Sequence, residues 1–552
     1  MGMKGRVAGW VLAVMPVAAC FRSESWDNLL DAADSDDPSS SSGAESGLDT
    51  LLTSTVTGVA SSSGGGGDTS GTGGGESDGG GDQGDLPPVI DALTINGVEG
   101  KAQVLSAAQV TIEAAVSDDH DAVSRVVFSI PGQEPITVAA PPYAVSLAIN
   151  SDQWNGDHAI EAVAYDDAEQ ASAPAQVGLT VDLPAGGSVV WEWKEPNLSY
   201  YSAALDVAVD GEGNVVVAGY RKVGLDMKQM IQRFEVRKFD PSGSELWSRT
   251  TPQAAKPEGA NAARGVAIDP FGNIVVVGEV FASGAWQSLI QRYTGSGAMI
   301  EQKLGQVGDH ALDVAMAPSG AFVVGGYREK KEGSDAMVWA FDADGGPLWV
   351  ASFAQISGAQ HNVRGVALHP NGDVFGAGEL RRPNKVRQGF VLQVRDGAPG
   401  WFRLTPELGQ PQDLAHDVTI SADGDVIAVV QRESESDQLW LLRLDPSGEK
   451  IDEYFDPTAR CESDEGCALA IDVSGNVLVA GAVLAPGAGL NTLVRKFEGK
   501  WLSTAWTTVS DGFDSDDDRS LAVTCDKVGF VYTAGFQQRA GGRRLWVAKI
   551  NP

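Results

Sequence analysis

One pattern of apolar and polar positions occurs seven times along the C-terminal two thirds of the chain. It first reads DVAVDGEGNVVVAGY from Asp206, where two short apolar runs flank a polar turn that ends in glycine. The turn glycines lie 48 to 59 residues apart and are Gly213, Gly272, Gly320, Gly372, Gly424, Gly475 and Gly529. A repeat of about fifty residues with strand-like content predicts a propeller or an array of β-units.

Each repeat contains four strand-like segments, but the count of the fourth segment is offset. Third strands recur seven times, whereas fourth strands follow only six of them, because the chain ends at Pro552. The six are expected near Trp247, Met299, Trp349, Trp401, Tyr454 and Trp501. The segment SVVWEW at 188–193 matches SELWSR at 244–249 and supplies the missing strand. A strand from the N-terminal end that completes the last sheet removes an exposed edge. The prediction is an all-β fold with a seven-bladed β-propeller over 188–552.

The turns predict that the two faces of such a disc differ. Short turns such as DPFG and DPSG, with Pro second and Gly fourth, join first to second and third to fourth strands. These short turns alternate with the longer connections along a blade, so all of them lie on one face of the disc. The variable connections, such as 221–235 and 250–264, lie on the other face. Because loops on a rigid scaffold carry function, we expect a site on this variable-loop face or at the channel mouth.

The first strands predict how adjacent blades interlock. A row of large residues alternates with a row of small ones, so that neighbouring sheets can interdigitate. The large row is Val207, Val266, Val314, Val366, Val418, Leu469 and Leu521, and the small row is Ala208, Ala267, Ala315, Ala367, Thr419, Ala470 and Ala522.

Residues 88–184 alternate apolar and polar residues in five short segments, from Val110, Ser124, Tyr143, His158 and Gln176. Such segments in about a hundred residues predict one immunoglobulin-like β-sandwich. The PPY from Pro141 and the run GDHAIEAVAYDDAEQASAP from Gly156 resemble bacterial Ig-like domains of surface proteins.

The N-terminal segment predicts export. Residues 1–19 combine Lys4 and Arg6 with an apolar run, as in a signal peptide. The VAAC ending resembles the bacterial lipobox, which implies a lipid on Cys20; the alternative is an ordinary signal peptide with an incidental cysteine. Residues 20–87 are rich in Ser, Gly and Asp and predict a disordered tether. We expect a lipid-anchored protein of the outer membrane or cell surface.

Charge and cysteine count narrow the classes of partner. The formal net charge of −34 argues against nucleic acid, which requires a basic surface. Four cysteines are too few for a disulfide-built scaffold. In an exported protein, however, Cys461 and Cys467 could form a local disulfide, which would leave Cys525 as a buried thiol. We expect a monomer whose partner is an unknown protein or glycan.

Candidate chemistry is sparse. The loop 511–518 contains Asp511, Asp514 and Asp516, which could hold calcium or form a solvated acidic loop. His310, His361 and His416 precede first strands of three blades and could ligate a metal at the channel mouth, or be ordinary loop histidines. No GxSxG, HExxH or P-loop spacing occurs. We therefore expect no catalytic residue and, calcium apart, no cofactor.

The repeats resemble the bacterial SBBP-type β-propeller repeat. VAVDGEGNVVVAG and EVRKFDPSGSELW match its two conserved stretches, and the resemblance covers about 188–552. It implies the fold and an exported protein, but no single activity. The hypothesis is a non-enzymatic binding scaffold. The alternative is a propeller enzyme with a site at the channel mouth that acts on polysaccharide or uses a quinone.

Overall fold

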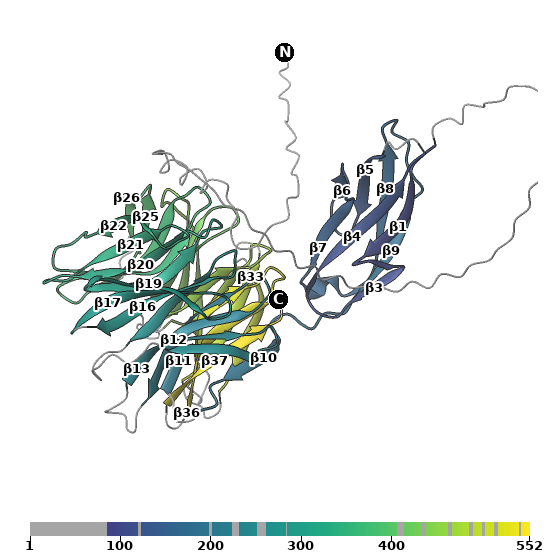
Figure 1. The fold of residues 1–552 in the computed structure, drawn as a ribbon. Helices are drawn as coiled ribbons and strands as arrows, with labels where there is room; N and C mark the ends of the chain where they lie inside the picture. The colour runs from purple at the N-terminus through teal and green to yellow at the C-terminus, as the bar shows by residue number, and fades with distance from the viewer. Residues whose placement is uncertain are drawn as a thin grey trace, which may run out of the picture.

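In the computed structural model the described residues are 86–119, 123–197, 201–223, 231–250, 261–282, 284–405, 413–432, 438–461, 466–484, 489–498, 503–512, 517–539 and 542–552. The predicted signal peptide, Cys20 and nearly all of the tether lie outside them. The described chain is built of β-strands with one short helix, the 3-10 turn η1 (Asp152–Trp154). None of its helices is long and apolar enough to cross a membrane. Figure 1 shows a smaller part, β1 to β9, and a larger part that contains the remaining strands.

The smaller part is a sandwich of two sheets. Its strands are β1 (Val89–Ile95), β2 (Val98–Glu99), β3 (Lys101–Val104), β4 (Ala108–Ser117), β5 (Val123–Ser129), β6 (Ile136–Val138), β7 (Ala144–Ile149), β8 (Gly156–Asp166) and β9 (Ala175–Val181). The sheet orders are β2-β1-β4-β7 and β3-β9-β8-β5-β6. Alternate residues point inward, so that Ile112, Phe128 and Ile160 are fully buried between the sheets.

The larger part consists of four-stranded antiparallel units, which we number 1 to 7 in chain order. The strands of units 1 to 3 are β11 (Tyr201–Val209), β12 (Val215–Val223), β13 (Ile231–Phe239), β14 (Glu245–Thr250); β15 (Ala262–Ile268), β16 (Ile274–Ala282), β17 (Ala285–Tyr293), β18 (Met299–Val307); β19 (Asp309–Met316), β20 (Phe322–Glu329), β21 (Ser334–Phe341) and β22 (Pro347–Phe353).

Units 4 to 7 continue the series. Their strands are β23 (Gln360–Leu368), β24 (Val374–Arg381), β25 (Arg387–Arg395), β26 (Ala398–Thr405); β27 (Asp413–Ile420), β28 (Val426–Arg432), β29 (Gln438–Leu444), β30 (Lys450–Arg460); β31 (Ala468–Ile471), β32 (Val477–Leu484), β33 (Leu490–Glu498), β34 (Ser503–Ser510); β35 (Arg519–Cys525), β36 (Val531–Arg539), β37 (Gly542–Ile550) and β10 (Val189–Lys194). Short bridges join units 3 and 4, and units 5 and 6, into two eight-stranded sheets.

The units are arranged in a propeller-like order. Each first strand packs against the first strand of the next unit, from β11 through β15, β19, β23, β27 and β31 to β35, and β35 packs against β11. Strand β10 pairs antiparallel with β37, which gives the sheet order β10-β37-β36-β35 (Figure 1). The last sheet is therefore completed by the strand that precedes the first repeat.

Two details of the expected repeat were wrong. In unit 7, Val523 pairs with Thr533 as Val207 pairs with Val217, so Val523 and Thr524, not Leu521 and Ala522, occupy the large and small positions. The cause is the last turn, in which Gly529 follows Asp526 by three residues, as the glycine does in the other turns. This spacing moves the large and small positions of β35 two residues toward the C-terminus from where they were expected. The fourth strand of unit 6 is β34, which contains Trp506; Trp501 lies outside the described residues.

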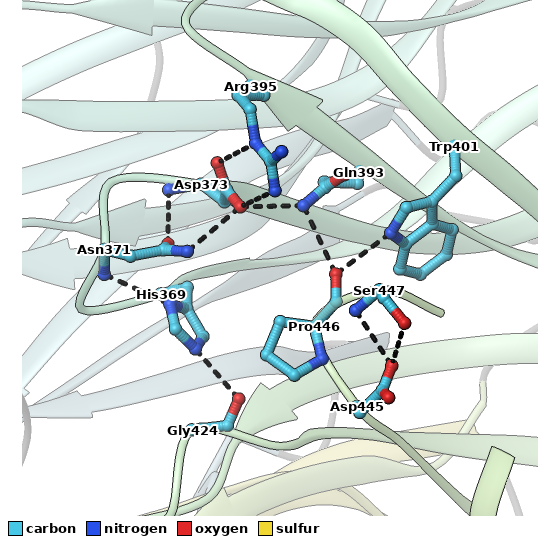
Figure 2. A network of polar contacts seen from close by, with 10 residues as sticks. All are labelled: His369, Asn371, Asp373, Gln393, Arg395, Trp401, Gly424, Asp445, Pro446 and Ser447. Atoms are coloured by element: carbon cyan, nitrogen blue, oxygen red, sulfur yellow. Dashed lines mark hydrogen bonds and ion pairs between the residues drawn. The ribbon is translucent and has the colours of Figure 1, made fainter. Parts of the chain in front are cut away.

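The tight turns lock neighbouring units together at one end of the strands. In Figure 2, Trp401 of unit 4 donates its Nε1–H to the carbonyl of Pro446 in unit 5, at 3.0 Å. The backbone N–H of Asn371 donates to Nδ1 of His369, so Nε2 of His369 carries the hydrogen and donates to the Gly424 carbonyl at 2.8 Å. These polar groups are occupied by structural contacts, which leaves the opposite face as the place to look for a site.

Candidate functional site

A β-bulge lies near the start of the first strand in units 1 to 5 and 7, at the end that the variable connections enter, and in unit 6 the equivalent residue, Cys467, directly precedes β31. At the bulge, one residue of the first strand is skipped in the pairing with the second strand. We pair this residue with the one fifteen positions later in the sequence, which lies on the second strand of the same unit. The seven pairs are Leu205/Tyr220, Arg264/Glu279, Leu312/Tyr327, Arg364/Glu379, His416/Gln431, Cys467/Ala482 and Leu521/Phe536. We call these positions the mouth ring. The mouth ring varies more than the turns and the large row, because its seven pairs include five different combinations of side chains.

The first charged pair of the mouth ring is extended by a histidine from the next unit. Arg264 donates to Oε2 of Glu279 through Nε at 3.2 Å and Nη2 at 3.0 Å. Nδ1 of His310 lies 2.9 Å from Oε1 of the same carboxylate. Burial raises the pKa of Glu279, but Arg264 and His310 outweigh it and hold the pKa below its usual value. Because the ionised carboxylate only accepts, Nδ1 of His310 is the donor.

The His310 ring also lies in a row of aromatic side chains. It stacks on Tyr327 with the ring centroids 4.2 Å apart, and the centroid of the Trp286 ring lies 5.9 Å from that of His310. Its Nε2 lies 3.4 Å from the carboxylate of Glu329. His310 is thus held between two carboxylates and two aromatic rings.

The second charged pair belongs to unit 4. Arg387 donates to Oε1 of Glu379 at 2.6 Å, and Arg364 donates to Oε2 at 3.1 Å. Burial opposes ionisation, but the two guanidinium groups lower the pKa of Glu379. Next to it, His416 lies 3.0 Å from the side-chain oxygen of Gln431. Burial and the charge of Arg364 lower the pKa of His416 to about 3, so this histidine is neutral.

Units 7 and 1 form a less charged sector of the mouth ring. Leu521 and Phe536 of unit 7 pack with Leu205 and Tyr220 of unit 1 in one apolar cluster. Phe536 is fully buried, and Tyr220 is 9% exposed. The mouth ring therefore carries ion pairs in units 2 and 4 and mainly apolar and aromatic side chains in units 7 and 1.

Immediately after the bulge, three carboxylates link the first strands in pairs. Asp206 accepts the N–H of Val207 at 2.8 Å and, from the next unit, the N–H of Val266 at 2.7 Å. Asp313 links unit 3 to Val366 of unit 4, and Asp417 links unit 5 to Leu469 of unit 6. Each carboxylate thus satisfies two backbone amides.

The partner units carry Gly265, Gly365 and Ala468 at the same position. A Cβ at Gly265 would lie 2.9 Å from the backbone nitrogen of Val314, and one at Gly365 would lie 2.5 Å from the carboxylate of Asp417. The glycines therefore allow the next strand to approach closely. Carboxylates alternate with small residues around the ring for this reason.

The environment of these carboxylates changes their titration. Each keeps some solvent contact but lies deep among the first strands. Burial raises the pKa of Asp313 to about 6. Burial, with the charge of Asp313, raises the pKa of Asp417 to about 7 and that of Asp206 well above its ordinary value. The three groups lie close enough to influence one another.

The structure does not bring the three predicted histidines into one cluster. His310 and His416 have the partners given above, whereas His361 lies 2.9 Å from the carbonyl of Ser334 and is 1% exposed. Among the residues that the structure describes, no three His, Cys, Asp or Glu side chains form a metal-ligand group. Of the calcium candidates, Asp514 and Asp516 lie outside the described residues.

The cysteines have separate structural positions. Cys461 and Cys467 form a disulfide with their Cα atoms 5.2 Å apart, which joins the end of β30 to the mouth ring of unit 6. Cys525 is a buried thiol that donates to the carbonyl of Ile471 at 3.2 Å. Neither feature places a reactive thiol at the surface of the mouth.

Sequence reasoning missed the mouth ring and the paired carboxylates. The arginines and glutamates stand fifteen residues apart in the sequence, and Asp stands at the start of alternate repeats. Both patterns are visible once the repeats are aligned. Only the bulge, however, shows that the residue before each first-strand run turns toward the mouth.

Comparison with known proteins identifies part of the chain. Residues 94–162 match the model of a bacterial Ig domain. A bacterial Ig domain is typical of extracellular or surface proteins. The comparison with curated proteins found no significant match.

Solved structures similar to the chain share little sequence with it. A protein of unknown function from Dyadobacter fermentans is 14% identical with a TM-score of 0.39, over 66% of this chain and 99% of that one. A Penicillium chrysogenum alpha-L-arabinanase complexed with arabinobiose is 10% identical with a TM-score of 0.40, over 66% and 98%. A subtype N11 neuraminidase-like protein of a flat-faced bat influenza virus is 10% identical with a TM-score of 0.35, over 66% and 96%.

Proposed function

We propose that the protein is an exported, lipid-anchored binding protein of the cell envelope, whose closed seven-bladed propeller presents its variable-loop face to a protein or glycan. The mouth ring is the observation that carries this proposal. Seven equivalent pairs of positions hold five different combinations of side chains, since Leu/Tyr and Arg/Glu each occur twice, while the turns and packing rows around them repeat more closely. Diversity confined to one end of a repeated scaffold is typical of a recognition surface.

The order of segments supports presentation at a distance from a membrane. A lipid on Cys20 would anchor the chain, since each buried methylene contributes about 0.8 kcal/mol. The tether, followed by the sandwich of β1 to β9, would then separate the propeller from the lipid surface. In this arrangement the protein is expected at the outer membrane or the cell surface, as a monomer.

The charges at the mouth favour binding over catalysis. Glu279 and Glu379 are paired with arginines, and their pKa values are lowered, so neither is suited to donate a proton at neutral pH. The alternative is an enzyme, and one observation favours it: Asp313 and Asp417 have pKa values near those of general acids. Both carboxylates, however, already accept two backbone amides each.

Two measurements test the proposal. Full-length protein is applied to a glycan array and cross-linked to envelope extracts, alongside the mouth variant Arg364→Ala and the tight-turn variant Asp445→Ala. We expect a reproducible ligand whose capture is reduced by Arg364→Ala and unchanged by Asp445→Ala, because Asp445 only organises an exposed turn. Equal capture by both variants would overturn a binding face at the mouth. Turnover of the captured glycan would instead favour the enzyme.

The anchor is tested separately by cell fractionation. Cys20→Ser is expected to move the protein from the membrane fraction to the soluble fraction. If the variant remains in the membrane fraction, the lipid anchor on Cys20 is refuted, and the binding proposal is unaffected.

A further inference from the structure

A group of aromatic and basic side chains lies at the variable-loop end of the seam between units 1 and 7. It consists of Tyr201, Tyr220 and Lys222 from unit 1 and of Phe536 and Arg543 from unit 7, and we call it the aromatic seam. The two tyrosine rings stack with centroids 6.4 Å apart and an interplanar angle of 21°. Tyr201 is half-buried, so part of its ring faces solvent. A Cβ at Gly542 would lie 2.7 Å from the Tyr201 ring, so the two units meet closely there.

Two cations lie on these rings. Nζ of Lys222 lies 4.7 Å from the ring centre of Tyr201 and 5.6 Å from that of Tyr220, and Cζ of Arg543 lies 4.1 Å from the ring centre of Phe536. The rings provide cation–π contacts, which are weaker than an ion pair. Arg264 adds a third positive charge near Tyr220, but Glu279 neutralises it.

Lys222 has no carboxylate partner among the residues that the structure describes. Burial, and then the nearby charge of Arg543, lower its pKa. A half-buried ammonium group beside a second cation is unfavourable unless an anion completes the site. It is also unusual in a chain with a net charge of −34, where carboxylates are abundant.

We propose that the aromatic seam binds the carboxylate-bearing sugar units of an acidic glycan. The inference rests on the proposed binding function and specifies its ligand. The sugar ring would stack on the exposed part of Tyr201, because aromatic side chains offer a flat apolar face to the C–H groups of a sugar. The carboxylate would lie between Lys222, which acts as a point charge, and Arg543, which adds a second positive charge beside the rings.

The chemistry of the surface favours a glycan over an acidic peptide. A peptide carboxylate needs only the cations, whereas the exposed part of the Tyr201 ring adds a flat apolar face that fits a sugar ring. The same mouth ring also carries the Arg364 and Glu379 pair, whose donors and acceptors suit the hydroxyl groups of further sugar units.

The test uses full-length protein and three probes in calorimetric titrations. The probes are an oligogalacturonate, the same oligosaccharide with its carboxyl groups methyl-esterified, and a polyglutamate of equal charge. The variants are Lys222→Gln and the matched control Lys549→Gln. Lys549 also lies over aromatic rings, 3.9 Å from the centre of Phe530, and its pKa is also lowered by burial, but it occupies the tight-turn end of unit 7.

We expect the oligogalacturonate to bind and its methyl ester to bind at least about tenfold more weakly. Lys222→Gln should lower the affinity at least about tenfold, and Lys549→Gln should leave it unchanged. Binding should also weaken with added salt, since it depends on charge. Lys222→Gln should unfold at the same midpoint as Lys549→Gln. With equal midpoints, a loss of binding reports on the site and not on folding.

Three outcomes would overturn the inference. Equal binding of the acid and its ester would remove the role of the carboxylate. Equal effects of Lys222→Gln and Lys549→Gln would place the site elsewhere. Polyglutamate binding as tight as oligogalacturonate would make the site a receptor for acidic peptides. Because the glycan array and envelope extracts include neutral ligands, the proposed binding function can survive each of these results.

Discussion

Replacing Asp313 with alanine is expected to destabilise the protein more at pH 4 than at pH 8. The Asp313 carboxylate accepts the backbone N–H groups of Val314 and Val366, each at 2.7 Å, and these residues are 7% and 5% exposed. Alanine leaves both buried amides without an acceptor. Each unpaired group costs about 1–3 kcal/mol, so the substitution removes about 2–6 kcal/mol of stability when charge plays no part.

The pH dependence follows from the raised pKa. Burial raises the pKa of Asp313 to about 6, whereas an aspartate in an unfolded chain titrates at about 3.9. The folded state therefore holds its proton more tightly, and stability falls as pH rises from about 4 to about 6. One pKa unit corresponds to about 1.4 kcal/mol, so this loss amounts to about 3 kcal/mol. The alanine variant has no carboxyl group at this position and does not lose this stability as pH rises. The cost of the substitution is therefore smaller at pH 8 than at pH 4 by about 3 kcal/mol.

The assay is urea unfolding of the full-length chain at pH 4 and pH 8, followed by tryptophan fluorescence. Asp240→Ala serves as the control, because Asp240 is also an Asp that accepts two backbone N–H groups, from Ser242 and Ser244. Hydrogen bonds, first from the Ser242 side chain, lower the pKa of Asp240, so the cost of this control should not shrink at pH 8. An Asp313→Ala cost that is equal at both pH values, or larger at pH 8, would refute the reasoning.

Three further substitutions probe how the units are held together. Trp401→Phe removes the hydrogen bond to Pro446 and should cost about 1 kcal/mol in urea unfolding; an unchanged midpoint would show that this contact does not stabilise the seam. Cys461→Ser combined with Cys467→Ser opens a seven-residue loop and should cost about 2 kcal/mol, matched by adding reductant to the unsubstituted protein; a reductant effect that persists in the double variant would contradict the assignment. Ala315→Leu should overpack the contact with the neighbouring unit and cost about 1–3 kcal/mol, so an unchanged melting temperature would count against the packing of first strands.

The strands could be predicted from the sequence because their signals are local. Alternating apolar residues and a glycine at the fourth turn position recur in each repeat, and counting fourth strands located β10 beside β37. The register of β35 could not be predicted as reliably. Its turn reads DKVG instead of the usual pattern, and the true register depends on the hydrogen bonds that Asp526 makes within that turn.

The candidate site was harder to predict from the sequence than the strands, because it depends on contacts between repeats. His310 stands out in the sequence as one of six histidines, but its partner Glu279 belongs to the preceding unit. Lys222 is inconspicuous among forty basic residues, and its significance comes from the aromatic rings beneath it and the distribution of charge around it. Neither relation is encoded by spacing within one repeat.

The alternation of Asp with glycine or alanine on the first strands divides the proposed ring into couples. Asp206 joins units 1 and 2, Asp313 joins units 3 and 4, and Asp417 joins units 5 and 6, while unit 7 has Ala522 at this position and is held instead by β10. The natural module of this scaffold is therefore a double repeat of about a hundred residues. Designed or evolved rings that gain or lose such a couple keep every carboxylate matched to its amides, whereas the loss of one member of a couple leaves a carboxylate facing the wrong neighbour or a backbone amide without its acceptor.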